Sequence, residues 1–202
     1  MGGGSTNAVP IVSKIYCSTS LTTLMIRKRP NVVNGGGFVV TDCTHNIVFV
    51  VDGCGMLGAK GELMVRDCDG ASLLFLRKKG GIIQALSTHN RWNGYSMDYQ
   101  GTNKLLFSLT DPKPCLATRS AIRIQVEPKS HSKDCDFEVD GSFTDRACVI
   151  IDRRGNIAAQ VGVEMMGNKD FYHVMVQPGY DQAFVIGVIA VLDNIYGEST
   201  AC

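Results

Sequence analysis

Short runs of hydrophobic residues recur along the chain, and glycine, asparagine, aspartate or proline separates one run from the next. Runs of this length, rich in Val, Ile, Leu, Phe and Thr, are typical of β-strands. In residues 121–127 apolar and polar side chains alternate, as in an antiparallel strand with one buried and one solvated face. Residues 81–90 fit either a strand extension or a helical turn. The pattern predicts twelve strands, at residues 21–29, 37–43, 47–52, 61–68, 72–79, 91–97, 105–110, 121–127, 136–142, 147–152, 157–165 and 171–177.

Two of the separators share one turn motif, Asp67-Cys68-Asp69-Gly70 and Asp152-Arg153-Arg154-Gly155. Aspartate at the first position caps such a turn with its side chain. Glycine at the fourth position adopts the left-handed conformation that a tight hairpin needs. Residues 42–46 form a looser version, in which we expect Asn46 to take the left-handed conformation. Because a hydrophobic run precedes and follows each turn, we expect a mostly antiparallel sheet.

The C-terminal segment follows a different pattern. Residues 183–192 are ten consecutive apolar or glycine residues, which is longer than a typical strand. Asp181 is a good helix N-cap and Gly197 a good C-terminal stop, so we predict a helix over about residues 181–196. Crossing a bilayer takes about 20 apolar residues, so this segment is too short to be a transmembrane helix. A helix that is apolar on all sides must be buried on all sides, which places it inside a closed barrel of strands.

Composition narrows the class of protein. The chain has 202 residues, of which 45% are hydrophobic and 19% are charged, so it is too apolar to be intrinsically disordered. Its length predicts a single domain, which we place at residues 15–197, with tails at residues 1–14 and 198–202. The formal net charge is +1, so charge gives no support for binding to nucleic acid.

The basic residues gather in three short clusters, at residues 27–29, 77–79 and 153–154. Such clusters are compatible with ordinary solvated strand faces and loops. They are also compatible with a surface that binds an anionic ligand or a membrane. The sequence leaves both interpretations open.

The cysteines and the N-terminus bear on the cellular compartment. None of the eight cysteines forms a C-x-x-C pair, no Asn-x-Ser/Thr sequon occurs, and no signal peptide is recognisable. We therefore expect a protein that is not secreted, in the reducing environment of the cytoplasm or the nucleus, with no metal site. Residues 1–6 fit the N-myristoylation pattern, with Gly2 as the acceptor, but a glycine-rich tail explains the same residues.

The order of several segments resembles a known family. These segments are residues 24–28, 37–42, 48–53, 87–92, 105–108, 135–142, 158–160, 182–185 and 191–193. With them the chain resembles the plant LURP-one-related proteins, which are similar to the tubby C-terminal domain and to the phospholipid scramblases. The resemblance implies a mainly β fold, a twelve-stranded antiparallel barrel closed around a central hydrophobic C-terminal helix.

The search for catalytic chemistry favours no enzyme class. Residues 53–58 match G-x-G-x-x-G, but a new strand, instead of the helix that a dinucleotide site requires, is predicted to follow them. Residues 67–70 are too short for a calcium-binding loop. We therefore predict no enzymatic activity and no cofactor.

The resemblance to the tubby domain implies phosphoinositide binding through basic side chains on the barrel surface. The candidate lipid-binding residues are Arg27, Lys28, Arg29, Arg77, Lys78 and Lys79, and an acylated Gly2 is a candidate second membrane contact. The leading hypothesis is a monomeric, non-enzymatic module, peripheral to the membrane, that binds an anionic lipid or a protein partner. The family name associates it with plant defence. A small-molecule carrier and an enzyme of unrecognised type are the alternatives.

Overall fold

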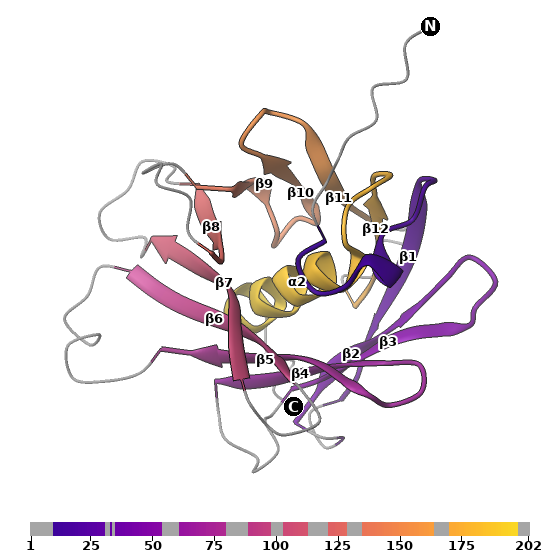
Figure 1. The fold of residues 1–202 in the computed structure, drawn as a ribbon. Helices are drawn as coiled ribbons and strands as arrows, with labels where there is room; N and C mark the ends of the chain where they lie inside the picture. Colours follow the sequence, from indigo (N-terminus) through magenta and orange to yellow (C-terminus); the bar gives the residue numbers. More distant parts are fainter. Residues whose placement is uncertain are drawn as a thin grey trace, which may run out of the picture.

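We analysed the protein as a computed structural model, shown in Figure 1. The structure describes residues 10–30, 33, 35–53, 61–79, 89–97, 103–112, 121–128, 135–163 and 170–197, without the side chains of residues 89, 103 and 112. The ambiguous segment 81–90 and the glycine-rich residues 53–58 therefore lie mostly outside the described residues.

The twelve predicted strands all form, and they close into one antiparallel barrel. Each strand pairs with its neighbours in sequence, and β1 pairs with β12 to complete the circle. Closure gives every strand a hydrogen-bonded neighbour on both sides and leaves no sheet edge. The strands are β1 (Thr22–Lys28), β2 (Gly37–Thr41), β3 (Ile47–Asp52), β4 (Glu62–Asp67), β5 (Ser72–Lys78), β6 (His89–Met97), β7 (Asn103–Pro112), β8 (Ile122–Val126), β9 (Phe137–Ser142), β10 (Ala147–Asp152), β11 (Ile157–Val163) and β12 (Phe171–Val176).

The apolar C-terminal segment forms the helix α2 (Gln182–Tyr196), which lies in the middle of the barrel (Figure 1). All residues from Ala183 to Leu192 are buried, as the uninterrupted apolar pattern predicts. Phe184 packs edge-on against Phe107 of β7, with the ring centroids 5.2 Å apart. Gly187 of α2 lies close to Leu74. A Cβ atom added to the glycine would lie 2.8 Å from the Cδ1 atom of Leu74. Within the described residues no helix is long and apolar enough to cross a membrane.

The hairpin turns confirm the role of the aspartates and change one residue assignment. Gly70 and Gly155 have positive φ angles, and their amides donate to the carbonyls of Asp67 and Asp152. In the turn that begins at Asp42, the residue with positive φ is His45 and not Asn46. His45 is the fourth residue of that turn, as the two glycines are of theirs, so the expectation that this turn is looser was wrong.

The ends of α2 lie where the sequence predicts. Asp181 is the N-cap, and its carboxylate accepts the amide of Phe184 at 3.1 Å. The helix ends before Gly197, but Gly197 has a φ of −65° and is therefore not left-handed. Glycine is required there for space, because an added Cβ would collide with the carbonyl oxygen of Asp193 and approach Lys28.

Part of the expected N-terminal tail is bound to the barrel. Residues 10–17, which we call the arm, include the short 3₁₀ helix η1 (Lys14–Tyr16). The amides of Ile11, Val12 and Ser13 donate to the second carboxylate oxygen of Asp181, and the ring of Tyr16 packs on Phe49 at 5.4 Å. The arm therefore lies across the N-terminal end of α2. Residues 1–9, including Gly2, lie outside the described residues.

Tyr180, in the connection between β12 and α2, makes the stability sensitive to alkaline pH. Its hydroxyl donates to Asp152 at 2.9 Å, and burial together with this contact raises its pKa to about 12. Below pH 10 the tyrosine is protonated in both the folded and the unfolded chain. Between pH 10 and 12 only the unfolded chain loses the proton, so the free energy of unfolding falls.

We expect Tyr180→Phe to reduce this alkaline loss of stability, measured as the change in urea midpoint between pH 9 and pH 11. Some loss remains in the variant, because burial also raises the pKa values of Tyr172 and Tyr196. An equal loss in both proteins would contradict the assignment.

Candidate binding surface

The two basic clusters of interest lie at the same end of the barrel. Residues 27–29 are at the C-terminal end of β1, and residues 77–79 are at the C-terminal end of β5. Because consecutive strands of the barrel are antiparallel, β1 and β5 run in the same direction. This end also holds the C-terminus of α2, since Lys28 contacts Asp193. Around the barrel wall, however, the clusters are four strand spacings of about 4.8 Å apart.

Two of the six predicted residues are mostly buried and pair with carboxylates. The Lys28 ammonium lies 3.2 Å from Asp193 of α2. The Arg29 guanidinium lies 2.8 Å from Asp52 and also donates to the carbonyl of Val51. Both side chains are only 17% exposed, so their charges are compensated and largely turned away from solvent. Lys28 and Arg29 thus join the end of β1 to α2 and β3, which leaves them little capacity for a ligand.

The other four residues are exposed, but they divide between two sides of the barrel. Arg27 lies on β1, whereas Arg77, Lys78 and Lys79 lie at the end of β5. Arg77 pairs with Glu62 at 2.7 Å and stacks over the ring of Phe75. In the described part of the chain, no salt bridge involves Lys78 or Lys79.

Strand pairing adds two arginines to the cluster on β5. The amide of Lys79 donates to the carbonyl of Arg91 at the start of β6, so these two residues are neighbours. Arg91 is opposite Thr110 of β7, and Thr110 is opposite Arg123 of β8. Lys79, Arg91 and Arg123 are all exposed, and together we call them the basic row. Four adjacent strands carry it, so it spans about 15 Å.

A second row of polar side chains runs beside the basic row. Arg77 is opposite Asn93, which is opposite Ser108, which is in turn opposite Gln125. We call the outer surface of β5 to β8 with these two rows the polar face. Two ion pairs join the face to its neighbouring strands: Glu62 of β4 pairs with Arg77, and Glu138 of β9 lies 3.4 Å from Arg123. Among the described residues, no salt bridge involves Lys79 or Arg91, so the polar face carries a net positive charge at this end.

Arg91 and Arg123 were absent from the predicted site. The alternation of residues 121–127 already indicated that Arg123 faces outward. What the sequence could not show is the cross-strand register that places it level with Lys79, because register depends on pairing between distant segments.

Two of the described cysteines, Cys135 and Cys148, have the character of structural thiols. Cys148 is buried, and burial raises its pKa to about 12. Burial and a hydrogen bond to Glu138 raise the pKa of Cys135. Protonated thiols are poor nucleophiles at neutral pH. Within the described ranges, no group of three His, Cys, Asp or Glu side chains is arranged to hold a metal ion.

Comparison with known proteins identifies the family. The sequence model of the LURP-one-related family matches residues 22–193 of the chain. This chain belongs to the LURP-one-related family. Protein LURP-one-related 6 of Arabidopsis thaliana is 56% identical to it over 193 residues, which cover 95% of this chain and 98% of the relative. Protein LURP-one-related 16 of the same plant is 49% identical, and the match covers all of both chains.

A solved structure supports the LURP-one-related fold. An X-ray structure of a protein from Arabidopsis thaliana superposes with a TM-score of 0.68 and 24% sequence identity, and the match covers 93% of this chain and 98% of the other. At this identity the likeness concerns the fold alone. The family match extends from the first residue of β1 to Asp193 near the end of α2, so it includes the whole barrel and its central helix.

Proposed function

We propose that this LURP-one-related protein is a non-enzymatic binding module that attaches to anionic lipid surfaces through the polar face. The observation that carries the proposal is the basic row, in which Lys79, Arg91 and Arg123 are exposed and level with one another across β5 to β8, with Thr110 of β7 between the two arginines. A lysine or arginine close to an anionic membrane surface contributes about 1 kcal/mol. Lys79 and Arg91, which take part in no salt bridge of the described residues, therefore favour a weak, reversible and salt-sensitive attachment, to which the paired Arg123 adds less.

An acylated Gly2 would supply a second membrane contact, and the chain length permits it. The eight Cα–Cα steps from Gly2 to Pro10 reach at most about 28 Å when fully extended. The seven residues of β5 span about 24 Å along the barrel wall. The tail before Pro10 is thus comparable in length with a barrel strand, and we propose that an acyl chain on Gly2 enters the same bilayer. A single myristoyl chain binds membranes only marginally, so the two contacts would depend on each other.

The proposal predicts that loss of two row charges weakens attachment. We expect the double substitution Lys79→Gln and Arg91→Gln to lower the partition coefficient onto phosphatidylserine and phosphoinositide vesicles about 30-fold, as expected for two contributions of about 1 kcal/mol. Co-sedimentation with these vesicles measures it, at low and at physiological salt.

A matched control removes the same charge from another part of the surface. The double substitution Lys14→Gln and Arg153→Gln changes two exposed residues at the other end of the barrel, and we expect it to leave pelleting unchanged. Vesicles of phosphatidylcholine alone test whether anionic lipid is needed. Equal losses in both double variants, or equal pelleting with neutral vesicles, would overturn the proposal. The predicted cytoplasmic or nuclear location and the defence role stay predictions.

A further inference from the structure

On the other side of α2, the barrel wall carries a patch of apolar side chains on its outer surface. Across β3, β2, β1 and β12, Val50 is opposite Val39, Val39 is opposite Arg27, and Arg27 is opposite Phe171. Met25 and Met175 continue this surface along β1 and β12. We call the outer surface formed by Met25, Val39, Val50, Phe171 and Met175 the apolar wall. In Figure 1, β1, β2, β3 and β12 lie across the helix from β6, β7 and β8.

These side chains are not part of the core around α2. Their neighbours in sequence, such as Leu24, Ile26 and Val40, point inward and are buried. Because successive strand residues face opposite sides, the residues of the apolar wall point outward, where they are half-buried. An antiparallel strand with a solvated outer face normally carries polar residues there, as the polar face does. Thr23 and Thr41 lie beside Met175 and Met25, so this outer surface is mixed, but its apolar share is larger than that of the polar face.

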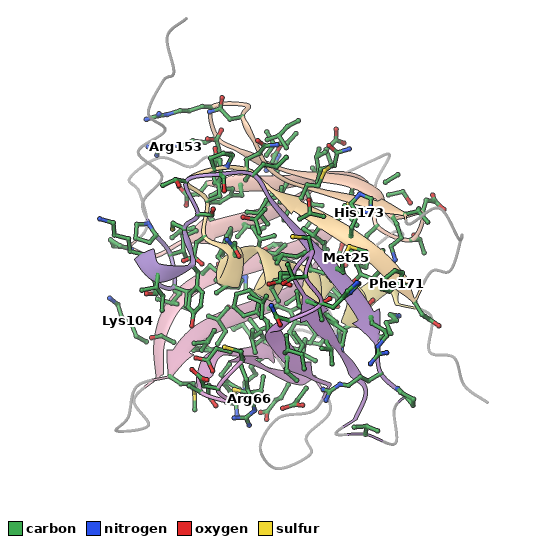
Figure 2. All side chains as sticks on the ribbon, turned by 90° about the vertical axis from the view of Figure 1, so that its right-hand side faces the viewer. Met25, Arg66, Lys104, Arg153, Phe171 and His173 are labelled. Atoms are coloured by element: carbon green, nitrogen blue, oxygen red, sulfur yellow. The ribbon has the colours of Figure 1, made fainter. Side chains whose placement is uncertain are left out.

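His173 extends the apolar wall toward β11. It is opposite Met25 on one side and Gly162 on the other. A Cβ added to Gly162 would lie 2.5 Å from the Nε2 atom of His173, so the imidazole rests on the bare backbone of the glycine. Figure 2 faces this side of the molecule and shows Met25, His173 and Phe171 beside one another on β1 and β12.

Arg27 is the positive charge within this surface. It is exposed, it lies between Val39 and Phe171, and it takes part in no salt bridge of the described residues. A complementary surface is therefore apolar and carries a carboxylate opposite Arg27. A second copy of this chain fits less well, because a two-fold interface centred here would bring two Arg27 side chains together. A bilayer also fits less well, because its hydrocarbon core contains no anion that could pair with Arg27.

We propose that the apolar wall docks a protein partner whose contact surface is apolar and presents an Asp or Glu carboxylate to Arg27. The proposal does not rest on lipid binding, because the apolar wall and the polar face lie on different sides of the barrel. If both proposals hold, the protein joins its partner to an anionic membrane.

The test combines cross-linking at the apolar wall with a charge substitution. The photoreactive residue p-benzoylphenylalanine replaces Val39 in the full chain or, as a control, Ser108 on the polar face. Both proteins are irradiated in an Arabidopsis extract, since the known relatives come from that plant. The protein captured from position 39 and not from position 108 is then purified and titrated against the full chain.

Capture alone is not sufficient, and Arg27 decides the result. We expect Arg27→Gln to weaken binding of the captured protein about tenfold or more, as for a charge pair at an interface, and Arg27→Lys to weaken it less. Arg153→Gln, which removes an exposed arginine elsewhere, should leave the affinity unchanged. Because Arg27 is exposed and takes part in no salt bridge of the described residues, Arg27→Gln and Arg27→Lys should leave the thermal midpoint unchanged.

Each other occupant gives a distinct result that overturns the proposal. A second copy cross-linked at position 39, with a dimer in sedimentation that Val39→Lys abolishes, identifies the apolar wall as a self-association surface. Pelleting with neutral phosphatidylcholine vesicles that Val39→Lys abolishes identifies a membrane contact. Capture of no specific protein, or binding that is insensitive to Arg27→Gln, also overturns it.

Discussion

Asp181→Ala should lower the free energy of unfolding by about 3 kcal/mol and release the N-terminal arm. The carboxylate of Asp181 has two separate roles. One oxygen accepts the amide of Phe184 and caps α2, and the other accepts the amides of Ile11, Val12 and Ser13 at 3.1, 2.7 and 3.0 Å. Loss of an N-cap costs about 1 to 2 kcal/mol. Hydrogen bonds to a charged group contribute about 1.5 to 3 kcal/mol each, but the amides of the arm regain part of this from water when the arm detaches.

Asp181→Asn separates the two roles of the carboxylate. Asparagine is as good an N-cap as aspartate, so α2 keeps its cap. Its amide nitrogen is a donor and cannot accept the three amides of the arm. We therefore expect the asparagine variant to lose about half as much stability as the alanine variant.

Urea unfolding measures the stability, and hydrogen exchange at residues 11–13 reports whether the arm is bound. Both variants should exchange these amides much faster than the wild type. Slow exchange at residues 11–13 in Asp181→Ala would show that other contacts, such as that of Tyr16 with Phe49, are sufficient to hold the arm.

The barrel and its helix could be predicted because their signals are local. Each strand is one hydrophobic run between turn residues, and α2 is one uninterrupted apolar segment. Closure of the barrel followed from that segment, because a helix without a polar side needs a complete enclosure. The turn at His45 was less visible, because the residue with positive φ is not a glycine there.

The binding surface was less predictable because its signals are not local. Lys28 and Arg29 look like their neighbour Arg27 in the sequence, but Asp193 and Asp52 compensate their charges. These carboxylates lie far along the chain, so only the folded structure brings them close. The bound part of the arm was missed for the same reason, since nothing near residues 10–14 indicates that Asp181 accepts their amides.

Arg146→Ala should be the second strongly destabilising substitution, with a loss of about 3 kcal/mol. Arg146 is 4% exposed, and its guanidinium lies between two rings, 4.4 Å from the centroid of Phe143 and 4.0 Å from that of Tyr172. It also pairs with Asp193 at 3.3 Å. Removal of one partner of a buried pair costs about 3 to 5 kcal/mol. Lys28 remains beside Asp193 in the variant, so we expect the lower end of that range.

Arg123 provides the matched control for Arg146. Arg123 pairs with Glu138 at 3.4 Å, nearly the distance of the Arg146 pair, but its side chain is 70% exposed. An exposed pair contributes at most about 1 kcal/mol, so Arg123→Ala should change the urea midpoint little. Position 146 has a positive φ of 55°. Arginine and alanine are both L-residues, so this backbone conformation should not contribute to the difference in stability between them. Because the pairs differ mainly in burial, equal losses in the two variants would show that enclosure between the rings does not stabilise this end of the barrel.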